Sequence, residues 1–271
     1  MALRINLNTA ALNAHRQLQG TDQALAGSIE RLSSGFRINR AADDPAGLAI
    51  SENLRAQVSG LGQAIANSSD AVNMIRTAEG ALSEVHSLLR TMRNLALHAA
   101  NTGAIDTTAA EADQTQITAA ISALDRIANN TQFGNKKLLD GTATGLEFQI
   151  GANAGQTTSV DIDSVKAADL GVSTIDVTSD AQAAITAVDA AVSTVSTLRA
   201  ELGATQRDLE SNMTSLGVAK ENIAASESSI RDADMAVEMV TFTRNQILLQ
   251  AGVAMLTQAN AAPQALLALL R

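Results

Sequence analysis

A seven-residue apolar repeat runs through the stretch 188–237. Every seventh position in it is apolar, and no proline interrupts it. These positions are Val188, Val195, Leu202, Leu209, Leu216, Ile223, Ile230 and Val237. On a helix of 3.6 residues per turn, such a repeat keeps one stripe facing a partner helix over a long distance. The pattern therefore predicts a helix from about 180 to the early 230s, with a stripe that another segment must cover.

A second long heptad run follows a strong helix start. Asp44 can cap free amides there, and Pro45 suits the first helical position. Apolar or small residues then recur in steps of four and three from Leu54 to Ala96, again without a proline. This pattern predicts one helix of about fifty residues, which would be about 75 Å long.

The two ends of the chain carry helical patterns of different character. Residues 3–33 are amphipathic, with an apolar face that includes Leu7, Leu18, Leu25 and Leu32. From 245 to 270 no residue is charged, and apolar residues fall on more than one face, so this helix must be buried. Pro263 lacks an amide hydrogen, so we expect it to kink or end the helix near Ala262.

Two sets of residues stand out in the C-terminal segment. Its large apolar residues include Met239, Phe242, Ile247, Leu249, Val253 and Leu256. A narrow polar stripe at helical spacing is formed by Gln246, Gln250, Thr257, Asn260 and Gln264. An apolar tail of this kind would aggregate if it were left free. The simplest solution is that both termini pair with each other and with copies of themselves. Identical contacts that do not close a ring give an open helical filament.

The middle of the chain changes its period. A third helix is predicted for 108–129, and the stretch 138–178 then shows short alternating runs punctuated by glycines. This stretch is the only β-like region, and it predicts a small hairpin-based patch. It is also rich in serine and threonine, which suits either a solvated, turn-rich tip or a site for O-linked sugar.

Composition argues against an ordinary compact enzyme. Of the 271 residues 46% are apolar, yet the chain has no Trp, no Tyr and four Phe, although aromatic residues usually dominate globular cores. The net charge of −9 argues against nucleic acid as the main partner. The absence of cysteine excludes disulfides and thiol chemistry. The sequence shows neither a conventional signal peptide nor an apolar run long enough for a spanning helix.

Candidate chemistry is sparse. His15, His86 and His98 do not pair at ligand spacing, so a metal site is not expected. Gly60–Gly62 begins like a dinucleotide loop but lies inside a heptad helix, which favours close helix packing instead. The aspartates at 161, 163 and 169 resemble a calcium loop, but the glycine and glutamate that such a loop needs are missing. We therefore predict no active site, no metal and no cofactor.

Several stretches carry the signature of a known protein family. Residues 28–50, SIERLSSGFRINRAADDPAGLAI, resemble the N-terminal signature of bacterial flagellin. TQFG at 131–134 and QIGA at 149–152 also resemble it. The C-terminal matches are Arg231–Asp234, Gln246–Leu248, Gln250–Gly252, Gln258–Asn260, Pro263–Gln264 and Leu269–Arg271. The resemblance covers about 1–165 and about 180 to the last residue, so the outer variable domains of longer family members are expected to be missing.

The resemblance implies a mainly α fold, in which the N- and C-terminal halves form a long antiparallel bundle or coiled coil. The expected inner tube domain combines 1–42 with 233–271, and the expected bundle domain combines 43–180 and its hairpin patch with 181–232. The two heptad runs would cover each other through Leu54, Leu61, Ile75, Leu82, Leu89, Leu202, Leu209, Leu216, Ile223 and Ile230. The apolar residues of the two ends, Leu7, Leu18, Leu25 and Leu32 with the six named in the C-terminal segment, would form the assembly interface. The polar stripe would face either a central channel or a hydrogen-bond network between subunits.

The family resemblance also implies partners and a location. The expected partner is the chain itself, as a helical homopolymer, and the expected location is the extracellular flagellar filament. The flagellar export apparatus, a chaperone, and cap and hook-junction proteins would also bind the chain. Family members are exported without a cleaved signal peptide.

One functional patch of the family matches poorly. Vertebrate innate-immune recognition of flagellin uses an arginine, a leucine and a glutamate, where this sequence has Thr91, Leu95 and Gln116. Only the leucine agrees, so we expect weak receptor activation.

Two alternatives to a filament subunit stay open at this point. The first is a hook–filament junction protein, which shares these termini, although the dense match at both ends favours the filament subunit. The second is a membrane-active helical protein that inserts 235–270, but the Gln and Asn residues of that segment would be costly in lipid. An enzyme is the least favoured class.

Overall fold

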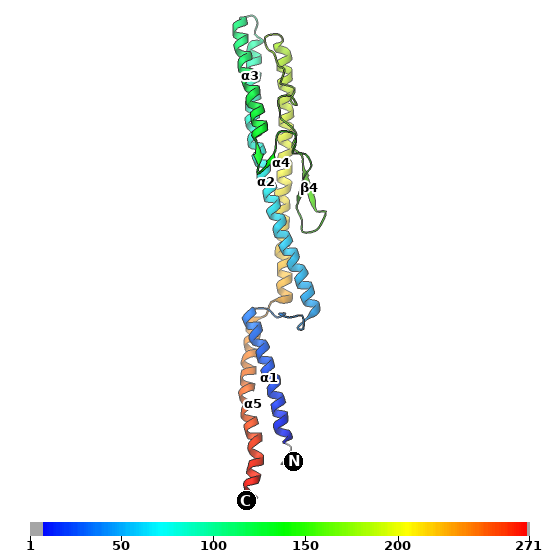
Figure 1. The fold of residues 1–271 in the computed structure, drawn as a ribbon, viewed down its shortest axis with the longest axis vertical. Helices are drawn as coiled ribbons and strands as arrows, with labels where there is room; N and C mark the ends of the chain where they lie inside the picture. Colours follow the sequence, from blue (N-terminus) through cyan, green and yellow to red (C-terminus); the bar gives the residue numbers. More distant parts are fainter. Residues whose placement is uncertain (1–7, 270–271) are drawn as a thin grey trace. The chain divides into compact units, whose positions relative to one another are not determined.

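The computed structural model describes the backbone of residues 8–269 and the side chains of residues 8–261. This described part is mainly helical, with two small antiparallel sheets of two strands each. Contacts divide the chain into two compact units. The terminal unit combines 1–56 with 222–271, and the central unit comprises 57–221. Figure 1 shows the elements of both units.

In the terminal unit, two antiparallel helices lie side by side: α1 (Thr9–Ser34) and α5 (Met235–Leu269) (Figure 1). Helix α1 begins at Asn8, whose side chain accepts a hydrogen bond from the Ala11 amide at 3.1 Å. It ends at Gly35, which takes the left-handed conformation with φ of 76° that glycine adopts without strain. Both helix ends therefore carry residues whose chemistry favours a cap.

The sequence predicted a kink or an end of the helix near Ala262. Helix α5 continues through Pro263 to Leu269, so the predicted end is wrong. A proline at 263 deprives the carbonyl of Ala259 of its usual partner four residues on. The Asn8 side chain donates a hydrogen bond to this carbonyl at 2.8 Å. Because α1 supplies the missing donor, the helix can pass the proline without an unsatisfied carbonyl.

The connections that follow α1 and precede α5 are held together. Phe36 forms a β-bridge with Asp232, and the Ala233 amide donates to the Gly35 carbonyl at 2.9 Å. The Arg231 guanidinium lies 4.8 Å from the centre of the Phe36 ring and binds Glu52 at 2.6 Å. Stacking, main-chain bonds and an ion pair thus fix the two connections within the terminal unit.

The central unit contains most of two long helices and all of a third. Helix α2 (Pro45–Ala99) and helix α4 (Ala181–Arg231) cross from one unit into the other, and α3 (Thr107–Asn130) lies wholly in the central unit. Within the central unit α2 and α4 run antiparallel. Three ion pairs show this, since the residue numbers rise along α2 while those of their partners fall along α4. The pairs are Arg76–Glu210 at 3.1 Å, Glu79–Arg199 at 3.6 Å and Arg93–Asp189 at 2.5 Å.

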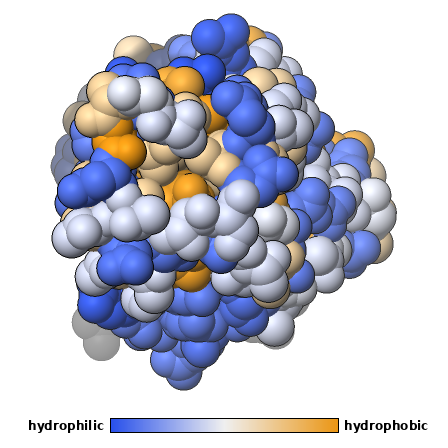
Figure 2. Space-filling view, turned by 90° about the horizontal axis from the view of Figure 1, so that it is seen from above, coloured by the Kyte–Doolittle hydropathy of each residue, from blue (hydrophilic) through white to orange (hydrophobic). Residues whose placement is uncertain are grey.

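The core of the central unit follows the two heptad stripes. Side chains of α2, α3 and α4, together with those of the mostly irregular segment 138–177, form one buried cluster. Leu82 and Leu89 of α2 and Ile117 of α3 are fully buried in it. In the end-on view, hydrophobic side chains show only as separate spots among hydrophilic ones (Figure 2). The predicted mainly α fold, with an antiparallel helical bundle, is confirmed.

The predicted hairpin patch is also confirmed. Strands β3 (Leu146–Gln149) and β4 (Thr157–Val160) pair antiparallel, with Leu146 opposite Val160. A second pair, β1 (Gln132–Phe133) and β2 (Lys136–Lys137), lies before 138–178, so the expectation that 138–178 is the only β-like region is wrong. Its two-residue turn starts at a glycine with positive φ, a signal of a tight hairpin.

The β3–β4 hairpin is anchored on the helices of the central unit. Asn67 of α2 donates to the Gln149 carbonyl at 3.0 Å, and Asn212 of α4 donates to the Ile150 carbonyl at 3.1 Å. A Cβ atom added at Gly60 would lie 3.1 Å from that of Ala152. Gly60 thus serves close packing, but against the turn between β3 and β4 and not against another helix as the sequence suggested.

The segment that leads into α4 is irregular but well bonded. Gln114 of α3 donates to the Ile175 carbonyl and accepts from the Val177 amide, each at 2.9 Å. The hydroxyls of Ser179 and Thr178 hydrogen-bond the Asp176 carboxylate and lower its pKa to about 2. The amides of Thr178 and Ser179 also donate to this carboxylate, at 2.9 and 3.4 Å, and this satisfies the exposed backbone just before α4.

Candidate assembly surface

The terminal helices meet along a heptad seam. On α1 the seam is Ala11, Ala14, Leu18, Thr21, Leu25, Ser28 and Leu32, all at least half-buried. On α5 it is Glu238, Phe242, Asn245, Leu249, Gly252, Leu256 and Ala259, all half-buried. The steps of three and four are those of a coiled coil. Two antiparallel helices alone thus cover one stripe of each other.

Large and small residues alternate across this seam. A Cβ atom added at Gly252 would lie 2.9 Å from the Leu18 Cδ1, so the leucine fills the space that the glycine leaves. Ser28 is buried although it is polar, which suits a position opposite a large side chain. An ion pair at 3.8 Å joins Arg31 to Glu238 near the end of the seam.

One face of α5 outside the seam is apolar and uncovered. Met239, Val240, Ile247 and Leu248 are about half or more exposed, and together with Thr243 and Arg244 they line a shallow groove of about 490 Å³. Met235, Val237, Val253 and Met255 are exposed on the same helix. We call the residues Val237, Val240, Arg244, Ile247, Leu248, Ala251 and Met255 the outer face of α5. Exposed apolar surface of this extent on one helix is typical of an interaction site.

The structure separates the predicted interface residues into two groups. Leu18, Leu25, Leu32, Phe242, Leu249 and Leu256 lie in the seam, whereas Met239, Ile247 and Val253 are exposed. Leu7 lies outside the described residues. The polar stripe is exposed at Gln246, Gln250, Thr257 and Asn260, and the side chain of Gln264 lies outside the described part. The stripe occupies a side of α5 different from the outer face.

Sequence reasoning missed the polar and small members of the seam. Ser28, Asn245 and Gly252 do not belong to an apolar pattern, so a search for apolar residues passes over them. The signal that would have found them is the step pattern of four and three from Glu238, matched to the same pattern on 11–32.

The predicted bundle residues are spread over both units. Those buried in the central unit are Leu61, Ile75, Leu82, Leu89, Leu202 and Leu209, and Leu216 is half-buried there. Leu54, Ile223 and Ile230 are half-buried in the terminal unit. The stripe stops at Ile230, because α4 ends at Arg231, and Val237 is 61% exposed on the next helix.

The three positions aligned with the receptor patch lie in the central unit. Thr91 and Gln116 are exposed, and Leu95 is half-buried against the core. Nearby, His98 Nδ1 lies 2.7 Å from a carboxylate oxygen of the buried Asp113.

Two of the aspartates considered for a calcium loop have structural partners. Asp161 accepts a hydrogen bond from the Gly145 amide at 2.5 Å, and Asp169 accepts one from the Ser164 hydroxyl. In the terminal unit, amides of Arg40 and Asn39 bind Asp43 and lower the pKa of its carboxyl. No helix in the described part of the chain has the length and apolar character needed to cross a membrane.

Comparison with known proteins gives matches over nearly the whole chain. The bacterial flagellin N-terminal helical region matches residues 5–144, and the bacterial flagellin C-terminal helical region matches residues 185–270. A flagellin of Bacillus subtilis (strain 168) is 45% identical over 99% of this chain and 100% of its own length. A flagellin of Halalkalibacterium halodurans is 47% identical over 98% of this chain and 99% of its own.

A solved structure agrees with these matches. The crystal structure of Bacillus cereus flagellin is 25% identical, with a TM-score of 0.51, and the match covers 56% of this chain and 88% of that one. The helical regions at both ends, the heptad stripes and the identities of nearly half the residues lead to one conclusion: the chain belongs to the bacterial flagellin family.

Proposed function

We propose that the chain is the structural subunit of a bacterial flagellar filament and polymerises through its terminal helices. The observation that carries the proposal is the uncovered apolar outer face of α5, on a chain that belongs to the flagellin family. Helix α1 covers only one stripe of α5, so other copies of the chain must bury the rest. Neighbours that are all bound in the same way then form an open helical polymer.

The two parts of the chain are proposed to occupy different layers of the filament. Residues 1–42 with 233–271 form the inner tube of the filament, and 43–180 with 181–232 form the surrounding bundle. The polar stripe from Gln246 to Gln264 faces the central channel or neighbouring subunits. Support comes from the exposure of its described members and from the different side of α5 that the apolar face occupies.

Further partners come with this role. The chain is exported by the flagellar secretion apparatus without a cleaved signal peptide. A chaperone binds it beforehand and prevents the terminal helices from associating with other copies before export. It then joins the filament outside the cell, next to cap and hook-junction proteins. The function is structural and needs no catalytic group.

Two results would separate this role from the alternatives. The purified full chain should form filaments visible by electron microscopy when polymerisation is seeded. A membrane-active protein would instead release dye from liposomes without forming filaments, and a junction protein would not extend a filament with itself.

A truncation tests the role of α5 directly. Removal of 235–271 deletes the outer face, so the shortened chain should stay monomeric at concentrations where the full chain polymerises. The central unit retains its helices in this variant, and circular dichroism can check that they are present. Normal polymerisation of the truncated chain would contradict the proposal.

A further inference from the structure

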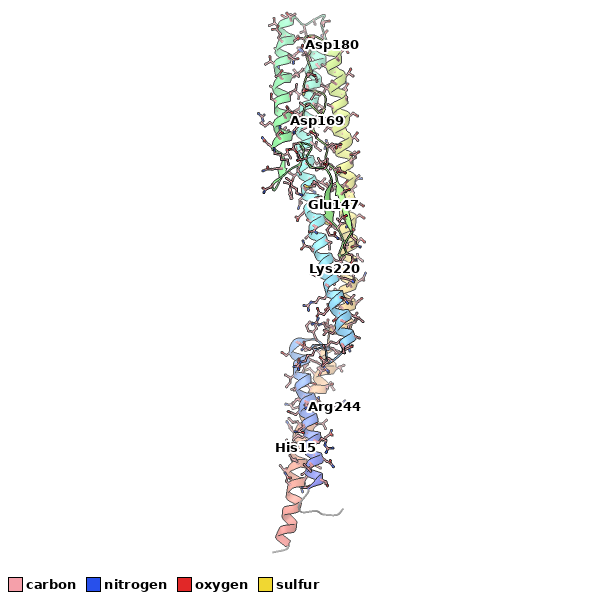
Figure 3. All side chains as sticks on the ribbon, turned by 45° about the vertical axis from the view of Figure 1, so that its right-hand side comes forward. His15, Glu147, Asp169, Asp180, Lys220 and Arg244 are labelled. Carbon is pink, nitrogen blue, oxygen red and sulfur yellow. The ribbon has the colours of Figure 1, made fainter. Side chains whose placement is uncertain are left out.

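One cation lies on the otherwise apolar outer face of α5. Arg244 lines the same groove as Val240 and Ile247, and Figure 3 shows it on α5, with His15 on α1 nearer the chain ends. No ion pair joins it to any of the described residues. When another copy covers this face, Arg244 loses water, and a buried charge without a counter-charge is costly. The covering surface therefore has to bring a carboxylate.

Asp22 is the acid that fits this requirement. The described parts of α1 and α5 carry three acidic residues: Asp22, Glu30 and Glu238. Glu30 binds Arg40 at 2.8 Å, and Glu238 lies 3.8 Å from Arg31. Asp22 is exposed, and no ionic partner for it occurs in the described chain. It is thus the unpaired acid of the helix pair.

Asp22 and Arg244 lie on opposite edges of the seam between α1 and α5. Gln17 of α1 and Leu248 of α5 line a groove of about 330 Å³ on one edge of the seam. Arg244 lies on that side, because it lines the groove of the outer face together with Leu248. Asp22 follows the seam residue Thr21 on the other edge, given the heptad positions of the two helices. One copy can therefore offer its acid to the cation of the next, which is a heterologous contact.

Apolar side chains accompany Asp22 on its edge. In the described part of α1, the exposed large apolar residues are Leu12 and Ile29, which are 54% and 51% exposed. Their heptad positions put both on the same side of α1 as Asp22, with the acid between them. The α1 edge therefore repeats the character of the outer face of α5: apolar, charged, apolar.

The spacings on the two surfaces match. Ile29 follows the acid by seven residues, and Val237 precedes the cation by seven. Leu12 precedes the acid by ten residues, and Met255 follows the cation by eleven. When α1 of one copy runs antiparallel to α5 of the next, contact of the two charges places Ile29 at Val237. The same register places Leu12 at Met255, about 15 Å away in the other direction.

We propose that Asp22 of one copy forms an ion pair with Arg244 of a second copy, and that this pair sets the register between neighbouring terminal helices. The inference rests on the proposed filament function and adds the residues that specify one contact in it. The ion pair satisfies the one charge on the outer face, while Leu12 and Ile29 cover the apolar side chains around it.

Charge exchange tests the pair. Full chains with Asp22→Arg or Arg244→Asp are compared with the wild type in seeded polymerisation, measured by sedimentation. Each single variant should raise the critical concentration by at least about tenfold, because like charges then meet at every contact. The double variant, which carries both exchanges, should restore polymerisation. Circular dichroism of the monomers checks that helix content is unchanged.

Mixing the single variants distinguishes a contact between copies from one within a copy. An equimolar mixture of Asp22→Arg and Arg244→Asp should polymerise, because each protein supplies the charge that the other needs. Arg16→Asp, which changes a cation on the polar face of α1, is the matched control and should polymerise like the wild type. The milder Asp22→Asn should give a smaller rise in critical concentration than the reversal.

Several outcomes would overturn the pair and leave the filament function intact. Single variants that polymerise like the wild type would show that the charges do not meet. Rescue by the double variant without rescue by the mixture would place the pair within one copy. If neither the double variant nor the mixture restored polymerisation, Asp22 and Arg244 would act separately. Failure of the wild type itself to polymerise would instead refute the proposed function.

Discussion

Truncation of one side chain on the outer face of α5 should weaken assembly and leave the monomer unchanged. Ile247 is 60% exposed and lines the apolar groove of this face. Because little of it is buried in the single chain, Ile247→Ala removes few contacts there. The full consequence appears only when another copy covers the residue.

The magnitude follows from the exposed fraction. Burying a whole isoleucine side chain stabilises by about 1.5–3 kcal/mol. About 60% of that gain remains for assembly, so Ile247→Ala should cost about 1–2 kcal/mol per contact. This corresponds to a rise in critical concentration of about 5- to 30-fold.

The assay is seeded polymerisation followed by sedimentation, with thermal unfolding of the monomer measured in parallel by circular dichroism. Val218→Ala is the matched control, since Val218 is similarly exposed, at 57%, but lies on α4 in the central unit. The control should change the critical concentration much less. If Ile247→Ala lowered the melting temperature of the monomer and left polymerisation unchanged, the outer face would not be an assembly surface.

Three further predictions concern the central unit. Leu82→Ala, at a fully buried core position, should destabilise the unit by about 2–5 kcal/mol, which thermal unfolding measures. The ionised Asp176 should contribute its full stabilisation above about pH 3.8 and lose it as the pH falls toward 2, because its pKa is lowered in the folded chain. Asp176→Asn should therefore flatten the dependence of unfolding on pH in that window. Activation of the vertebrate receptor should be weak, and Thr91→Arg combined with Gln116→Glu should raise it in a reporter-cell assay.

Each of these predictions has its own control. Ser83→Ala, at an exposed position next to the buried leucine, should change stability by less than about 0.5 kcal/mol. An equally steep acid transition in the Asp176→Asn variant would show that this carboxylate contributes nothing. Full activation of the receptor by the wild-type chain would contradict the prediction drawn from the poor match at these positions.

The helices could be predicted from the sequence because their apolar periods are long and uninterrupted. The stripe from Val188 to Ile230 and the run from Leu54 to Ala96 each keep one face of one helix toward a partner. The predicted end of this helix in the early 230s is confirmed at Arg231, although the apolar spacing runs past it. Val237 continues the spacing of seven, but the break after Arg231 turns the next helix, so this valine is exposed.

The assembly surface could be predicted only in part. Phe242 and Ile247 are both apolar residues of one segment, yet the first lies in the seam and the second is exposed. Composition cannot separate them, because the distinction depends on which stripe α1 covers. The predicted helix end at Pro263 failed for a related reason: the donor that replaces the missing amide is Asn8, more than 250 residues away in sequence.

A single cysteine gives the most direct test of the claim that other copies of the chain cover α5. The natural chain has no cysteine, so Val240→Cys creates a unique thiol at a site that is 65% exposed and similar in size. Its labelling rate with a maleimide should be fast in the monomer and at least about tenfold slower in filaments, where neighbouring copies bury the site. An equally fast rate in filaments and monomers would contradict the claim.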